Sequence, residues 1–297
     1  MIKLSQAARG HLVMFGFSLG IAGSFSLGSL IANQIDPVAV TVARFVLAVP
    51  LMGMFAAFSV GLKWKDAAQP WRYAIIGGLM AAYFVLMFEG LKTASPVSIS
   101  VVFTLTPILS GIAGYVLLRQ VIAPHSTFAL ALGAAGAAWV IFGADLESLL
   151  AFRMGTGEAI FLIGCICHGL STPLQRLFNR GESPIVFVLG TMIAGAVLML
   201  IYGRKEVAAI DWVSLPAIVW MTIGYLTVVS TALTFVAVNY AAMRLPSAKV
   251  MAYTYLTPSW VIVWEATLGH GFPRFAVIAG IAAAAAAMLI LLRHDTD

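Results

Sequence analysis

The tripeptide Leu105-Thr106-Pro107 recurs as Leu256-Thr257-Pro258, 151 residues later, and each copy lies inside a long apolar run. A second match, Asp36-Pro37 with Ser183-Pro184, recurs at a spacing of 147 residues. The tripeptide alone would be weak evidence for an internal repeat. Because the matches keep their order along the chain, together they predict that the chain consists of two related halves.

Apolar runs make up most of the chain. The 297 residues are 61% hydrophobic and 10% charged, with a mean hydropathy of +0.99. A soluble domain carries roughly 25% charged residues, so the composition excludes a soluble enzyme, a secreted disulfide scaffold and a nucleic-acid binder. A membrane span needs about 20 apolar residues. Ten runs qualify, namely 11–32, 38–59, 71–91, 95–118, 126–143, 157–178, 184–202, 215–239, 247–268 and 274–292.

The expected fold is an all-α polytopic membrane protein whose ten transmembrane helices form two five-helix repeats, residues 1–146 and 147–297. Because five is odd, the second repeat enters the membrane from the opposite side. Such inverted repeats are typical of secondary transporters that bind substrate between the halves. If the N-terminus is cytoplasmic, 11 of the 17 Lys and Arg residues lie on the cytoplasmic side of the membrane and 6 on the outer side. This bias predicts that both termini lie in the cytoplasm.

The two repeated prolines predict kinks at bilayer depth. Pro107 and Pro258 each remove a helical hydrogen bond, which frees a carbonyl toward a cavity, although packing without function is the alternative. Near the second kink, Tyr253, Thr257 and Trp260 share one helix face by their spacing. Because Tyr253 and Thr257 lie well inside the run, this face favours a pathway lining over an interfacial aromatic belt.

Polar side chains also form a stripe in the run 157–178. His168 and Ser171 share a helix face, and Ser24 corresponds to Ser171 in the first repeat. A polar stripe is costly against lipid, so it is expected to face the bundle interior or a wet cavity. The lone histidine is either a packing residue or a proton carrier.

Charged residues are scarce at membrane depth. Arg44 lies well inside the run 38–59 and needs partners, for which helix-end carbonyls or Glu89 are candidates. It is expected to be either a structural anchor or a substrate contact. Glu89 and Lys92 are spaced to pair at the rim of a helix. No carboxylate lies in the middle of any run, which favours facilitative transport over proton coupling.

These features resemble the drug/metabolite transporter superfamily of the EamA type, and the likeness spans nearly the whole chain. It rests on Arg44-Phe45, on Pro107 and Pro258, on the hinges that contain Lys92 and Arg244, and on Gly-rich runs that end each half. It implies ten helices in two five-helix halves. Phe88-Glu89 and the polar stretch before Pro107 resemble the YddG-like exporters of aromatic and other amino acids. The second half departs from the pattern, because Thr191 stands where Arg44 stands in the first.

The sequence therefore predicts an inner-membrane secondary transporter that exports small amphiphilic metabolites, foremost amino acids including aromatic ones, by alternating access and without proton coupling. A proton-coupled exporter of drugs or of metabolites such as nucleosides or sugars is the alternative. An intramembrane enzyme is a distant one, because the chain lacks metal-binding and nucleophile motifs.

The expected partners are a small-molecule substrate and membrane lipid, without nucleic acid, metal or cofactor. We expect a monomer, and a homodimer through the run Ala282–Ala287 remains open. Arg44, Lys92 and Arg244 are expected to have structural or gating roles. The expected substrate-cavity residues are Ser24, Tyr83, Phe88, Glu89, Thr104, Thr106, Pro107, His168, Ser171, Thr231, Tyr253, Thr257, Pro258 and Trp260.

Overall fold

The computed structural model describes residues 6–60, 68–120, 124–141, 145, 147, 154–272 and 275–293, and the regular elements in them are helices. The first half forms α1 (Gln6–Ile31), α2 (Pro37–Ser59), α3 (Trp71–Leu91), α4 (Pro96–Phe103), α5 (Thr106–Leu118) and α6 (Pro124–Ile141). The second half forms α8 (Thr156–Phe178), α9 (Pro184–Tyr202), α10 (Arg204–Ala209), α11 (Ala217–Thr227), the π-helix η2 (Val228–Leu233), α12 (Thr234–Ala242), α13 (Ser247–Ala252), the 3-10 turn η3 (Tyr253–Leu256), α14 (Thr257–Thr267) and α15 (Phe275–Arg293).

Several helices begin at a polar cap that is followed by a proline. Asp36, Ser95 and Ser183 each accept a hydrogen bond from a backbone N–H of the next turn. The Asp36 carboxylate is 2.8 Å from the backbone nitrogen of Val38. Proline lacks a donor and has a helical φ, so it suits the first turn, where no intrahelical acceptor is available. These caps explain why α2, α4 and α9 begin where they do.

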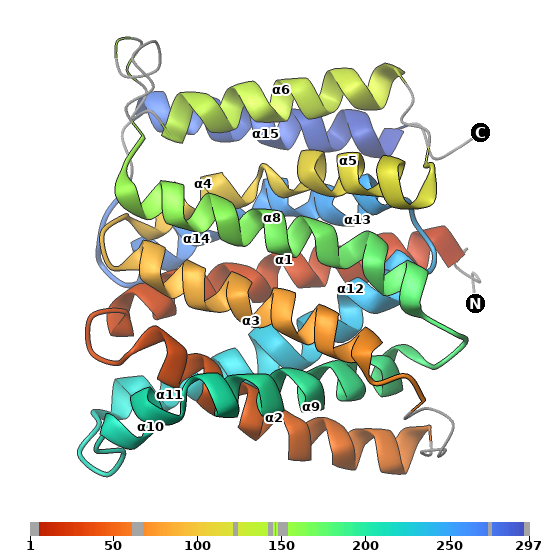
Figure 1. The fold of residues 1–297 in the computed structure, drawn as a ribbon. Helices are drawn as coiled ribbons and strands as arrows, with labels where there is room; N and C mark the ends of the chain where they lie inside the picture. Colours follow the sequence, from red (N-terminus) through yellow and green to blue (C-terminus); the bar gives the residue numbers. More distant parts are fainter. Residues whose placement is uncertain are drawn as a thin grey trace.

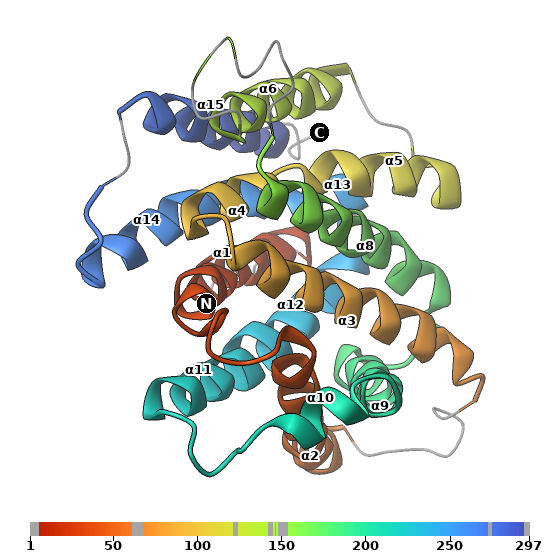
Figure 2. The same cartoon turned by 60° about the vertical axis from the view of Figure 1, so that its left-hand side comes forward.

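The helices form one bundle in which the two halves interleave. In both views α6 lies beside α15 at one edge and α2 beside α9 at the opposite edge, with α1, α3, α8 and α12 between them (Figures 1 and 2). Glycines allow the closest approaches. A Cβ on Gly136 of α6 would lie 2.6 Å from the Gly280 carbonyl of α15. The small-residue face of α15, with Ala284 and Ala287 buried, therefore packs within the chain.

The ends of the helices agree with a polytopic membrane protein. The first residue of α1 and the last of α15 lie at the same end of the bundle (Figure 1). Among the described residues, seven helical stretches are long and apolar enough to cross a membrane, and two further apolar helices, 127–139 and 277–290, are shorter. Each of the ten expected ranges contains described helix, but the stretch from α13 to α14 does not meet that criterion. The count of ten spans therefore stays a prediction.

Some of the expectations concern residues that lie outside the described ones. These are the chain termini (1–5 and 294–297), the repeat boundary at 146–147 in part, and residues 142–143 and 274 at the ends of two expected spans. The placement of both termini in the cytoplasm stays a prediction.

Candidate functional site

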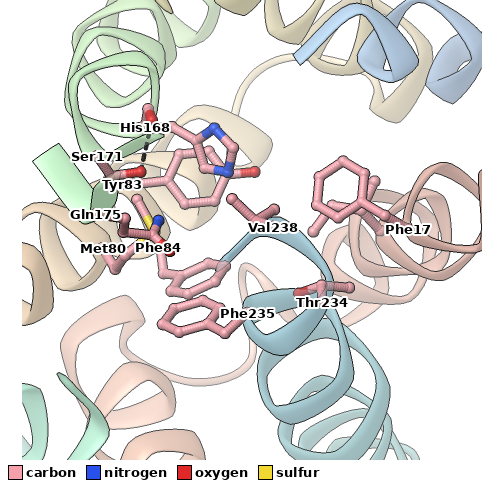
Figure 3. A pocket seen from close by; sticks show the side chains of 11 residues that line it. Phe17, Met80, Tyr83, Phe84, His168, Ser171, Gln175, Thr234, Phe235 and Val238 are labelled. Atoms are coloured by element: carbon pink, nitrogen blue, oxygen red, sulfur yellow. Dashed lines mark hydrogen bonds between the residues drawn. The ribbon is translucent and has the colours of Figure 1, made fainter. Parts of the chain in front are cut away.

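A small cavity lies in the centre of the bundle, between elements of both halves. It has room for only about one water molecule, so a larger molecule would enter only if the surrounding helices separated. Figure 3 shows side chains from α1, α3, α8 and α12 converging on it. Its lining residues are Phe17, Ile21, Met80, Tyr83, Phe84, His168, Ser171, Gln175, Thr234, Phe235 and Val238.

The cavity has one aromatic wall and one polar wall. The rings of Phe84 and Phe235 lie nearly parallel, at 10°, with their centroids 5.9 Å apart (Figure 3). On the other side, α8 presents His168, Ser171 and Gln175. Ser171 and Gln175 follow His168 by three and seven residues, so the three side chains share one helix face. This arrangement suits a molecule that is apolar at one end and polar at the other.

Two polar atoms of the lining are available to a ligand. The hydroxyl of Tyr83 and Nδ1 of His168 are buried and have no hydrogen-bond partner within the described part of the chain. Their rings are in contact, with centroids 4.6 Å apart. The hydroxyl of Ser171 is already used, because it donates to the His168 carbonyl at 2.7 Å. Unpaired buried polar groups are costly and often mark sites that a ligand or water completes.

Arg44 lies directly behind the aromatic wall and is completely buried. Its Nε and Nη2 donate to the Thr231 hydroxyl at 2.9 and 2.7 Å. Nη2 also reaches the carbonyls of Ser230 at 3.3 Å and Leu226 at 3.5 Å. The guanidinium carbon lies 3.4 Å from the centre of the Phe84 ring. The sequence predicted that Arg44 would need helix carbonyls or Glu89 as partners, and the structure pairs it with carbonyls and hydroxyls.

The acceptors of Arg44 come from an irregular stretch of helix. Val228–Leu233 forms a π-helix between α11 and α12. A π turn is wider than an α turn, shifts carbonyls out of the regular ladder and is often found at functional sites. Thr191 of α9, at the position equivalent to Arg44, instead donates to the carbonyl of Phe187 in its own helix. The buried charge of Arg44 therefore lies beside the π-helix that supplies its acceptors, whereas the equivalent position in the second half carries no charge.

Each repeated proline follows a short stretch, with helical backbone angles, that joins two α-helices. Pro107 lies in the first turn of α5, after a break at Thr104 and Leu105, and Pro258 lies in the first turn of α14, after η3. Each expected kink therefore coincides with an interruption of the regular α-helix just before the proline. The hydroxyls of Thr104 and Thr106 donate to the carbonyls of Val101 and Phe103, both at 2.6 Å.

The aromatic face of the second broken helix packs against α1. Tyr253 is hydrogen-bonded to His11 at 3.1 Å, and the indole nitrogen of Trp260 donates to the Ser18 hydroxyl at 3.3 Å. Thr257 is completely buried between them along this helix. These three side chains are absent from the described lining of the cavity. Their predicted place along a pathway stays a prediction.

Comparisons with known proteins agree with this fold. The model of the EamA-like transporter family matches the chain twice, over residues 8–142 and 155–293. The chain belongs to the EamA-like transporter family. An uncharacterized transporter of Bacillus subtilis (strain 168), YyaM, is 22% identical over 273 residues, which cover 91% of this chain and 90% of YyaM. A solved crystal structure that is 18% identical matches with a TM-score of 0.72 over 96% of each chain. The family model and the transporter YyaM point to a multi-pass membrane transporter rather than an enzyme.

Several predicted site residues of this EamA-like transporter lie at its ends. Lys92 pairs with Glu89 at 3.0 Å, and both side chains are about one-third exposed. Arg244 contacts Gln6 at 3.0 Å and the Tyr240 ring at 3.5 Å. These contacts place the two expected hinges at opposite ends of the bundle. Their gating role stays a prediction.

Other predicted residues of the EamA-like transporter are buried away from the cavity. Ser24 donates to the Ile21 carbonyl of its own helix at 2.6 Å, and Phe88 packs in the core close to Gly28. Of the predicted set, the structure brings Tyr83, His168 and Ser171 together at the cavity. Thr231 lies one layer behind it, on Arg44.

Sequence reasoning missed most of the apolar lining. A helical-spacing signal was present, because Met80 and Phe84 flank Tyr83 on α3, and Thr234 and Val238 share a face of α12. Among the described residues, no three His, Cys, Asp or Glu side chains gather as metal ligands would.

One ion pair ties the two halves together at the end where α1 begins. Arg72 of α3 donates to Glu182, in the connection between α8 and α9, at 2.7 Å, and to the Phe178 carbonyl at 2.5 Å. The two charged side chains are only 1% and 6% exposed. Burial alone would raise the pKa of the Glu182 carboxyl, but hydrogen bonds from Arg72 and from the Arg180 backbone outweigh it, so that pKa lies below its ordinary value.

Proposed function

We propose that this EamA-like transporter exports small amphiphilic metabolites across the inner membrane, foremost amino acids including aromatic ones. The observation that carries the proposal is the two-sided cavity. The rings of Phe84 and Phe235 offer a surface for an apolar side chain, while Tyr83 and His168 offer unpaired polar atoms to its polar end. The resemblance to YddG-like exporters points in the same direction.

Alternating access between two inverted repeats is the mechanism that we propose. Equivalent helices make equivalent contacts: α3 packs on α8 as α1 packs on α11 and α12, and α5 packs on α8 as α14 packs on α1. The pairs α2–α9 and α6–α15 join the repeats. The double match to one family model supports a duplicated architecture of this kind. Separation of α3, α8 and α12 would enlarge the cavity on one side of the membrane at a time.

We propose facilitative transport because no carboxylate is among the lining residues that the structure describes. An exchange of substrate for protons needs a group that binds both in turn. One observation favours a second candidate, proton-coupled export: the imidazole of His168 is part of the lining and its Nδ1 is unpaired. That imidazole is the group through which coupling would run.

The test is uptake of radiolabelled phenylalanine into proteoliposomes, with and without an imposed pH gradient. Saturable uptake that ignores the gradient is the expected result, with protein-free liposomes as the blank. Accumulation driven by the gradient, and lost in His168→Gln, would establish the proton-coupled candidate instead. If phenylalanine is not taken up under either condition, the amino-acid proposal is wrong.

A further inference from the structure

Arg44 is a buried cation that its surroundings satisfy only in part. It is completely buried, yet its Nη1 has no hydrogen-bond partner in the described part of the chain. No carboxylate pairs with it there either, since the ion pairs described are those of Arg72, Lys92 and His270. A buried charge is costly unless it is paired and hydrogen-bonded. The molecule thus holds a charge whose natural complement, an anion, is missing from the described chain.

A single layer of side chains separates this cation from the cavity. The Phe84 ring contacts the guanidinium on Arg44 and also lines the cavity. The Ser230 carbonyl accepts from Arg44 at 3.3 Å and from the hydroxyl of Thr234, another lining residue, at 2.9 Å. Movement of Phe84 away from the stacked Phe235 would uncover the guanidinium toward whatever occupies the cavity.

A purely structural role accounts poorly for the charge. Thr191 occupies the equivalent position in the second half and is uncharged, buried and bonded within its own helix. The fold therefore accepts a small neutral residue at this helix crossing. Arg72, a second arginine that is buried in the described part of the chain, has a carboxylate partner in Glu182. Arg44 differs from Thr191 because it carries a charge. It differs from Arg72 because no anion lies beside it in the described chain.

We propose that Arg44 binds the carboxylate of the transported molecule when the rings of Phe84 and Phe235 part. Nη1 is the nitrogen that the described chain leaves unpaired, and its N–H groups can donate charge-assisted hydrogen bonds to a carboxylate. The recognised feature is then the carboxylate rather than the amine, so aromatic monocarboxylates without an amine are ligands and aromatic amines are not. The inference rests on the proposed function, because it needs a small amphiphile in the cavity.

The experiment is competition against radiolabelled phenylalanine uptake in proteoliposomes. The competitors differ only in the head group: 3-phenylpropionate carries the carboxylate alone, and phenylalaninamide and phenethylamine lack it. For the wild-type chain, 3-phenylpropionate is expected to compete about ten- to a hundredfold better than either of the others, the range for a hydrogen bond to a charged group. In Arg44→Gln this ratio falls to about one, whereas in the matched control Arg72→Gln it is kept.

The outcomes separate the inference from the proposed function. Phenylalanine uptake with an acid preference that survives in Arg44→Gln overturns the role of Arg44 and leaves the transporter proposal intact. Absence of uptake by the wild-type chain overturns the proposed function, and the inference with it. Loss of the preference in Arg72→Gln as well would show that it reflects general damage, and would also overturn the inference.

A second variant serves if Arg44→Gln does not reach the membrane. Phe84→Leu removes the ring that covers the guanidinium while keeping an apolar side chain. Both competitors lose the same ring surface, so the expected result is a several-fold rise in the ratio by which 3-phenylpropionate competes better than phenylalaninamide. A ratio that stays the same or falls contradicts the proposal.

Discussion

The hydroxyl of Thr106 donates a 2.6 Å hydrogen bond to the carbonyl oxygen of Phe103. That carbonyl lies four residues before Pro107, so it is the acceptor that loses its helical donor at the proline. The second copy has another solution. There the backbone N–H of Thr257 donates to the carbonyl of Thr254, and the Thr257 hydroxyl has no partner in the described chain. The same sequence motif is thus satisfied in two ways.

This difference predicts unequal effects of the same substitution in the two copies. Thr106→Val leaves the Phe103 carbonyl without its donor and should lower the free energy of unfolding by about 1–3 kcal/mol. Thr257→Val removes a hydroxyl that has no partner, so it should change that free energy by close to zero or raise it slightly. The unfolding midpoint of each purified variant in detergent measures the difference. Equal losses in the two variants would contradict this account.

Two neighbouring glycines of α3 should also respond differently. A Cβ on Gly77 would lie 2.7 Å from backbone atoms of both Thr191 and Gly195 on α9, whereas a Cβ on Gly78 meets only a Leu198 methyl at 3.7 Å. Gly77→Ala should therefore lower the free energy of unfolding by about 1–3 kcal/mol, since the backbone of α3 or α9 must move. Gly78→Ala should raise that free energy by up to about 1 kcal/mol, because alanine favours the helix. Thermal unfolding in detergent tests both, and comparable midpoints would show that α3 and α9 do not approach this closely.

The Arg72–Glu182 pair predicts a loss of stability in acid. Because the pKa of Glu182 is lowered by folding, the pair stabilises the fold above the ordinary carboxyl value of 4.5 and ceases to do so as the pH falls through the lowered pKa. Glu182→Gln should lower the free energy of unfolding by about 1–3 kcal/mol at neutral pH. On acidification this variant should lose less further stability than the wild-type chain. Unfolding midpoints of both proteins, measured from neutral to acidic pH, give the comparison.

The control for this prediction is the ion pair at the rim. Glu89→Gln breaks the contact with Lys92, which is about one-third exposed on both sides, and such surface pairs contribute about 0–1 kcal/mol. It should leave both the stability and its pH dependence nearly unchanged. If Glu182→Gln behaves in the same way, the pair does not hold the two halves together.

The hydroxyl of Tyr83 is expected to matter for transport and not for stability. Tyr83→Phe removes a group that has no partner in the described chain, so the unfolding midpoint should stay the same or rise. If that hydroxyl binds the polar end of the substrate, half-maximal uptake of phenylalanine should need an about three- to tenfold higher concentration.

Tyr255→Phe is the matched variant, because its hydroxyl is also buried and unpaired there but the ring packs by Gly133 of α6 and is not part of the described lining. It should transport like the wild-type chain. A similar change of transport in both variants would mean that the cavity is not where the substrate binds.

The sequence predicted where helices begin and end better than it predicted which helices pack against one another. The expected runs 71–91 and 184–202 coincide with α3 and α9, because prolines, glycines and charges limit them. Helical spacing also grouped Tyr253, Thr257 and Trp260 on one face. Which neighbour that face would meet depends on the packing of α1, more than two hundred residues away, and no local pattern encodes it.

The partner of Arg44 shows a second limit. A buried arginine predicts that acceptors must exist, but the π-helix that supplies them has no sequence signature, and the run 215–239 reads as one regular helix. The aromatic wall was missed for a related reason. Phe84 and Phe235 look like ordinary membrane-facing residues until α3 and α12 are placed side by side.

The π-helix also determines the rotational phase of everything that follows it. One residue of α-helix corresponds to a rotation of about 100° around the axis. If Val228–Leu233 kept all its residues but wound as a regular α-helix, α12 would turn by about that angle relative to α11, and Thr234, Phe235 and Val238 would leave the cavity together. The chemistry of the cavity thus depends on a backbone insertion as much as on the side chains that line it.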